Sequence, residues 1–414
     1  MLLRAARRMA TLRGRVDLLL LGPAFVAAIA YVDPGNVATN VTAGAEHGYL
    51  LVWVIVSANL MAGLVQYLSA KLGLVTGQSL PEAVRDQMPR SVRLGYWLQA
   101  EAVAIATDLA EVIGGALALR LLFDLPLVMG GLITGCVSMV LLAVQDRRGQ
   151  APFERVVAGL LLVIAVGFFA SLVVAPPSAS GAVAGLVPRF DGTDSVLLAA
   201  AMLGATVMPH AIYLHSALAR DRHGRPTGAR KRPVLVATRV DVALAMLLAG
   251  SVNLAMLLGA ASALGGMAGV DTLEGAHAGL GQVLGPAVAT LFAVGLLASG
   301  LASTSVGCYA GAVIMQGLLR IRIPLLVRRL VTLIPALGLL AAGVDPTWAL
   351  VLSQVVLSFG VPFALVPLVV LTARRRVMGT DVNHRVTTVL ASGATAAIVL
   401  LNGVLIGLVL TGTA

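Results

Sequence analysis

The stretch AYVDPGNVATN, residues 30–40, follows directly on the apolar run LLLLGPAFVAAIAYV. Proline removes a backbone donor and clashes with the preceding turn of a helix, and it also pushes the residue before it out of the helical region. The apolar run is therefore predicted to be a helix that breaks at Asp33. A second apolar run, LLAAAMLGATVMPHAIYLHSALA (residues 197–219), has the same kind of interruption at Met208-Pro209-His210.

Composition places both breaks in a membrane protein. Of the 414 residues 58% are hydrophobic and only 12% are charged, against about 25% charged residues in soluble domains. The apolar residues form runs of about 20, the length that crosses a bilayer core as a helix. This pattern predicts an all-α polytopic membrane protein and excludes a β-barrel. Eleven transmembrane helices are expected, at about 17–44, 48–75, 94–122, 126–145, 153–175, 194–219, 235–264, 280–317, 324–343, 347–372 and 386–411.

The positions of the charges predict how the chain is oriented. The net charge is +10, but 27 of the 29 Lys and Arg residues lie in or beside alternate connections, which indicates membrane topology and excludes nucleic-acid binding. Only Arg120 and Arg189 lie at the remaining connections, which are expected on the opposite side of the membrane. The basic start, MLLRAARRMATLRGR, leads into a full-length span, so no cleavable signal peptide is expected. We expect a protein of the cell inner membrane with a cytoplasmic N-terminus, an external C-terminus and an odd number of spans.

The two breaks fall in the first and sixth spans, so five spans separate them. Because five is odd, two five-span halves would have opposite orientations in the membrane. Broken helices at matching positions of inverted halves are typical of the central site of a transporter. The prediction is one transmembrane domain, residues 1–414, with a first repeat at 17–175, a second at 194–372 and an eleventh helix at 386–411.

The residues at the breaks favour a cation site. Asp33 in the bilayer costs about 2.5–3.5 kcal/mol, which a bound cation would offset, although capping of backbone amides is the alternative reading. Its carboxylate, the Asn36 amide oxygen and unwound carbonyls near Ala30 and Ala205 are oxygen ligands for a cation. Met208, if it is not a packing residue, adds a soft thioether that suits Mn²⁺, Fe²⁺ and later transition metals better than Mg²⁺ or Ca²⁺.

Other polar groups in apolar runs leave alternatives open. Gln354 is either a ligand or a hydrogen-bonding group between helices. Cys136 and Cys308 both lie in apolar runs, so neither a disulfide framework nor a thiolate metal site is expected.

The third span carries three acids, Glu101, Asp108 and Glu111. On a regular helix the first two lie within about 20° of each other and the third about 60° further on. Three acids on one side of a membrane helix are expensive unless they line water or pair with cations. They form either a proton route, which His210 and His215 could share, or an ion-pair network with Arg328 or Arg329.

Three motifs together, DPGN in the first span, MPH in the sixth and E-x₆-D-x₂-E in the third, resemble the Nramp (natural resistance-associated macrophage protein) family over nearly the whole chain. The resemblance is closest to the bacterial manganese-transporter members. It implies a leucine-transporter-like fold of two inverted five-helix repeats plus an eleventh helix, and proton-coupled import of divalent metals. By motif, it implies that the inward-facing metal ligands are Asp33, Asn36, Met208 and the Ala205 carbonyl, joined in other conformations by Ala30 and Gln354. It also implies a proton network of Glu101, Asp108, Glu111, His210, Arg328 and Arg329.

The function predicted is a symporter that imports Mn²⁺ or Fe²⁺, and also Cd²⁺, Co²⁺ or Zn²⁺, with protons by alternating access. The alternatives are a passive divalent-metal channel and a sodium-coupled symporter of an organic substrate with the same fold. An enzyme is not expected, because no nucleophile–base arrangement or HExxH motif is present. The expected partners are metal ions, protons and the lipid bilayer, with no cofactor, nucleic acid or obligate protein partner.

Overall fold

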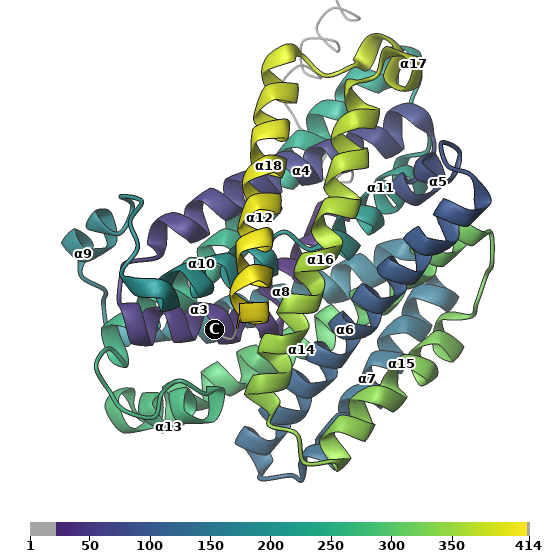
Figure 1. The fold of residues 1–414 in the computed structure, drawn as a ribbon. Coiled ribbons are helices and arrows are strands. Elements are labelled where there is room, and N and C mark those ends of the chain that lie inside the picture. Colours follow the sequence, from purple (N-terminus) through teal and green to yellow (C-terminus); the bar gives the residue numbers. More distant parts are fainter. Residues whose placement is uncertain (1–21, 412–414) are drawn as a thin grey trace, which may run out of the picture.

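The structure is a computed structural model and describes residues 22–411, almost all of them in helices (Figure 1). The basic segment at residues 1–15 and the first five residues of the first expected span lie outside the described residues. Within residues 22–411, nine helices are long and apolar enough to cross a membrane. The polytopic all-α architecture predicted from the sequence is therefore confirmed.

The long helices follow the expected order along the chain. They are α4 (Val52–Thr76), α6 (Arg90–Phe123), α7 (Leu127–Arg148), α8 (Gln150–Val174), α12 (Lys231–Ala263), α14 (Pro286–Leu319), α16 (Pro346–Ala373) and α18 (Arg385–Thr411), together with the interrupted pair α10 (Gly192–Thr206) and α11 (Pro209–His223). Short helices connect them: α5 (Leu80–Arg85), α9 (Ala179–Ala184), α13 (Leu273–Leu284) and α17 (Arg375–Met378).

Two further segments occupy the places of the remaining expected spans. The first is the interrupted segment α2 (Pro23–Ile29), η2 (Ala30–Val32) and α3 (Pro34–His47), and the second is α15 (Leu325–Ala341), which has 17 residues. Neither meets a spanning length of 18 residues as one continuous helix. The number eleven and the boundaries of the two repeats therefore stay predictions.

Small residues let the helices approach closely around the breaks. Figure 1 shows α6, α7 and α15 side by side, with α14 and α16 also against α6, and α12 packs against α3 and α4. On α14, a Cβ at Gly300 would lie 2.8 Å from the backbone nitrogen of Gly115 on α6. Close backbone approach at glycine is typical of membrane helix interfaces, where dispersion and not the hydrophobic effect holds helices together.

Candidate metal site

The first break has the geometry that its proline dictates. Helix α2 gives way to the short η2 segment, and Asp33 adopts an extended conformation, with φ −71° and ψ 168°, before α3 begins at Pro34. The Oδ1 atom of Asp33 accepts hydrogen bonds of 2.7 Å from both the backbone N–H and the side-chain amide of Asn36. The capping role considered for Asp33 is thus present, and it uses one carboxylate oxygen only.

The second break repeats this arrangement. Helix α10 ends at Thr206, Met208 is extended with φ −74° and ψ 118°, and α11 begins at Pro209. In a continuous helix the carbonyls of Ala30 and Ala205 would accept from residues 34 and 209, and both of these are prolines without an N–H. Each break therefore removes the α-helical donor of one carbonyl, at the two positions, Ala30 and Ala205, near which the sequence analysis expected carbonyl ligands.

A hydrogen bond joins the two breaks across the protein. The Asn36 side-chain amide donates to the Ala205 carbonyl over 3.1 Å. Gln354 on α16 lies against the first break, because a Cβ on Gly35 would come within 1.8 Å of its Nε2 atom. The structure thus brings Asp33, Asn36, Ala205 and Gln354 together, and Met208 follows Ala205 by three residues with its side chain completely buried.

Three buried oxygens at this junction lack a hydrogen-bond partner within the described residues: Asp33 Oδ2, Asn36 Oδ1 and Gln354 Oε1. Their residues are each 1% exposed or less. A buried acceptor left without a donor costs about 1–3 kcal/mol, more if it is charged. A carboxylate and two amide oxygens with free lone pairs fit a cation far better than they fit an anion.

Residues that the sequence analysis did not select hold the first break in place. Asn253 of α12 donates to the Tyr31 carbonyl over 2.7 Å, and Ser299 of α14 donates to the Val32 carbonyl over 2.6 Å. Gly114 of α6 leaves room for Pro34, since a Cβ there would lie 2.2 Å from the proline ring. The only sequence signal for these two residues is that an asparagine and a serine lie inside apolar runs. That signal is weak, because the sequence does not show which helix face either residue is on.

The acids of α6 divide into two kinds. Glu101 forms an ion pair of 2.7 Å with Arg328, and Asp108 forms one of 3.2 Å with the completely buried Arg329. Glu111 is completely buried and has no ion-pair partner in the described part of the chain. A Cβ at Gly307 of α14 would lie 2.8 Å from a Glu111 carboxylate oxygen. The ion-pair network considered for these acids is present, but it leaves Glu111 unpaired.

The two histidines lie in different surroundings. The Nδ1 atom of His210 is 3.4 Å from the hydroxyl of Thr107, which places it beside the acids of α6. The Nδ1 atom of His215 lies 2.7 Å from Gln66 Oε1 on α4, and the amide of Gln66 donates to the Tyr31 hydroxyl over 2.5 Å. His215 is therefore linked to the first break through α4 and not to the acid network. The sequence analysis did not name Gln66 as a candidate functional residue, although Gln66, like Gln354, is a side-chain amide in an apolar run.

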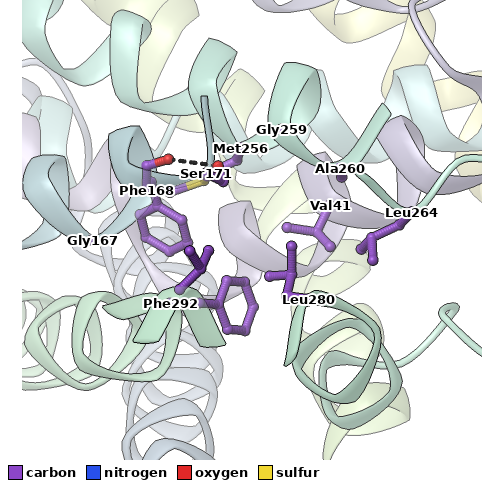
Figure 2. Close-up of a pocket in the computed structure, with 11 residues that line it drawn as sticks. Val41, Gly167, Phe168, Ser171, Met256, Gly259, Ala260, Leu264, Leu280 and Phe292 are labelled. Atoms are coloured by element: carbon purple, nitrogen blue, oxygen red, sulfur yellow. Dashed lines mark hydrogen bonds between the residues drawn. The ribbon is translucent and has the colours of Figure 1, made fainter. Parts of the chain in front are cut away.

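A small cavity elsewhere lacks the charged and amide oxygens of the junction. It measures about 20 Å³ and lies among α3, α8, α12, α13 and α14 (Figure 2). Its lining is apolar apart from the hydroxyl of Ser171, which donates to the Phe168 carbonyl over 2.9 Å. The junction of the breaks remains the candidate site.

Comparison with known proteins agrees with this geometry. Residues 24–408 match the natural resistance-associated macrophage protein-like family, Nramp. The chain is 64% identical over 394 residues to a divalent metal cation transporter, MntH, of Mycobacterium tuberculosis strain H37Rv, covering 95% of this chain and 92% of the relative.

Solved structures show the same fold. A manganese transporter of Eremococcus coleocola, crystallised with an aromatic bis-isothiourea compound, superimposes with a TM-score of 0.85 at 33% identity, covering 93% of this chain and 85% of that one. A nucleobase-cation-symport-1 family transporter superimposes with a TM-score of 0.60 at 16% identity, covering 92% of this chain and 91% of that one, and supports the fold alone. The chain therefore belongs to the Nramp family of membrane transporters, which are not enzymes, and has the leucine-transporter-like fold.

Proposed function

We propose that this chain imports divalent transition-metal ions into the cytoplasm across the cell inner membrane, coupled to protons, by alternating access. The observation that carries the proposal is the set of unpartnered buried oxygens of Asp33, Asn36 and Gln354 at the junction of two broken helices. Relatives at 64% and 33% identity are described as a divalent metal cation transporter and a manganese transporter. Mn²⁺ and Fe²⁺ are the proposed main substrates, because the site combines oxygen ligands with the Met208 thioether.

The residues at the two breaks have different proposed roles in binding the metal. Asp33 supplies the charge for the metal and, once the metal leaves, a group that can take up a proton. Asn36, Gln354 and the carbonyls of Ala30 and Ala205 supply neutral oxygens. Each break sits between two half-helices, so one half can tilt while the other stays in place, which exposes the site to alternate sides of the membrane.

The acids of α6 are the proposed proton route. Glu111, which has no ion-pair partner in the described part of the chain, lies three residues after Asp108 on α6, so a proton on one acid alters the charge felt by the other. Asp108 and Glu101 form ion pairs with Arg329 and Arg328, which hold their carboxylates in place along α6. Protons would thus travel along the acids of α6.

The proposal is tested by uptake into vesicles that contain the purified full-length chain. Mn²⁺, Fe²⁺, Cd²⁺, Ca²⁺ and Mg²⁺ are supplied with and without an inward pH gradient. Saturable uptake of the transition metals that accelerates with the gradient, with metal-dependent acidification inside, is the expected result. Flux that does not saturate would support a channel, and uptake that needs Na⁺ would support the sodium-coupled alternative.

We expect Asp108→Asn to reduce metal-dependent proton entry by about tenfold or more, since loss of a positioned proton-transfer group typically costs at least that factor. Metal affinity should change little, because Asp108 is not one of the ligands. The measurement combines an internal pH dye with Mn²⁺ uptake. Glu111→Gln serves as a second variant, since it removes an acid without leaving the buried Arg329 unpaired. Unchanged proton flux with much weaker metal binding would move Asp108 into the metal site.

A further inference from the structure

A groove runs between α4 and α12 on the outside of the helix bundle, away from the metal site. It encloses about 360 Å³. Its lining comes from one face of each helix: Leu60, Gly63, Leu64 and Tyr67 of α4, with Arg239, Val242, Ala243, Met246 and Leu247 of α12. The spacings of three, four and seven residues are those of a single helical face, so the groove follows both helices lengthwise. The two helices lie against each other in the fold (Figure 1).

The groove is closed at one end and polar at the other. At the closed end Asn59 packs directly on Gly250, where a Cβ would lie 2.3 Å from the asparagine amide. Further along, a Cβ at Gly63 of α4 would lie 3.9 Å from the Met246 side chain of α12, so the two helices are farther apart there. Along α12 the groove reaches from Met246 to Arg239, seven residues or about 10 Å by helix rise, which is roughly a third of the hydrocarbon core.

Its walls face the lipid. Leu60 is 69% exposed and Leu247 is 67% exposed, and both belong to helices long and apolar enough to span the bilayer. Exposed leucines at such positions contact acyl chains. A cleft between them is therefore filled by a hydrocarbon chain in the membrane.

Arg239 gives this apolar groove a charged end. Its guanidinium lies over the Tyr67 ring, 5.0 Å from the centroid, and its Nε donates to the Tyr67 hydroxyl over 2.9 Å. No carboxylate of the described residues lies within ion-pair distance of it, and the residue is exposed. The four terminal N–H groups are thus held in a fixed direction with no anion of the protein to receive them, and a phosphate oxygen matches that fork.

The depth of Arg239 matches the headgroup region of the inner leaflet. It lies eight residues after the start of α12 at Lys231, about 12 Å along the helix. The charge distribution places that end of α12 in the cytoplasm, and the exposed Arg232 lies on the same face one heptad earlier. Basic pockets between membrane helices on the cytoplasmic side are suited to anionic lipid headgroups.

We propose that this groove is a binding site for an anionic phospholipid of the cytoplasmic leaflet, with the phosphate on Arg239 and one acyl chain between α4 and α12. The site is independent of the metal junction and of the proposed transport function. Arg239 provides the preference for negative charge, and the groove provides the preference for a lipid over free phosphate.

The test is a lipid titration of the full-length protein followed by native mass spectrometry, with phosphatidylglycerol and phosphatidylcholine as the probes. Arg239→Gln should weaken the binding of phosphatidylglycerol roughly fivefold, the contribution of one arginine near an anionic surface, and leave phosphatidylcholine nearly unchanged. The matched control is Arg155→Gln, which removes an exposed arginine near the start of α8. It should change neither affinity.

A second variant tests the acyl chain. Ala243→Leu fills the groove at an exposed position and should lower the affinity for phosphatidylglycerol without disturbing the fold. Equal binding of both lipids by the wild type, or an unchanged affinity in Arg239→Gln, would overturn the proposal. So would an effect of Arg239→Gln with none of Ala243→Leu, since that result means that the headgroup binds without the groove.

Discussion

The Asp33→Asn variant is expected to lose metal uptake by at least about a hundredfold while the protein still folds and inserts, because removing a full charge from a buried divalent-cation site costs several kcal/mol. Asp33 is the acid of the two breaks, and its Oδ2 atom is one of the oxygens without a partner in the described residues. Asparagine keeps the volume and is as good a helix N-cap as aspartate, so the bond to the Asn36 backbone N–H can persist. The variant therefore removes the charge and leaves the break intact.

Asp345 provides the matched control for this substitution. It caps α16 by accepting from the Trp348 N–H over 2.8 Å, so Asp345→Asn makes the same chemical change at a second helix start. Mn²⁺ uptake into vesicles and Mn²⁺ binding by calorimetry are measured for both variants, with size-exclusion profiles as the check on folding. Near wild-type uptake by Asp33→Asn would remove Asp33 from the metal site.

The breaks were predictable from the sequence because their cause is local. A proline favours a helix break and removes the donor of one carbonyl, although Pro335, Pro362 and Pro367 lie inside the continuous helices α15 and α16. At Asp33 and Met208 the break was predicted from the proline together with the polar residues beside it. The meeting of the breaks through Asn36 and Ala205, 169 residues apart, is a long-range contact that inverted-repeat symmetry made expected. Metal ligation itself stays a prediction.

Contacts that depend on helix faces were not predictable. Asn253 reaches Tyr31 across 222 residues, and its sequence context of leucine and alanine gives no amphipathic pattern to orient it. Arg328 and Arg329 are neighbours in sequence, so spacing could not tell which would pair with Glu101 and which with Asp108. The contact of His215 with Gln66 on α4 likewise depends on which helix faces meet, and a part for His215 in proton transfer stays a prediction.

Met208→Ala is expected to retain much of the Mn²⁺ transport and to lose discrimination against Ca²⁺. Oxygen ligands alone form a hard site, which Ca²⁺ and Mg²⁺ suit as well as Mn²⁺ does. These ions are in large excess outside cells, so a selective site must disfavour them. A thioether at one ligand position does so, because hard cations gain little from sulfur and lose an oxygen or a water there.

The Met208→Ala substitution is expected to leave the helix break unchanged. Met208 precedes α11 and makes no side-chain cap hydrogen bond, so the break does not depend on the sulfur atom. The side chain is completely buried and packs in the apolar core, three residues after Ala205. We expect a metal bound at the junction to draw a water molecule into the space that the smaller side chain leaves. The control is Met202→Ala on α10, a methionine that is also buried in the apolar core but lies six positions earlier, within α10 and not at the break.

Uptake of Mn²⁺ and Cd²⁺ is measured at increasing Ca²⁺ for the wild type and both variants. In Met208→Ala we expect Ca²⁺ to inhibit Mn²⁺ uptake at about tenfold lower concentration, a change of roughly 1.4 kcal/mol in relative affinity. Cd²⁺, the softest ion of the set, should lose the most affinity, because it gains the most from sulfur. Met202→Ala should lower the amount of folded protein without changing the ion preference. If Ca²⁺ competes no better in Met208→Ala than in the wild type, Met208 is a packing residue like Met202, and the selectivity must come from the size of the oxygen cage.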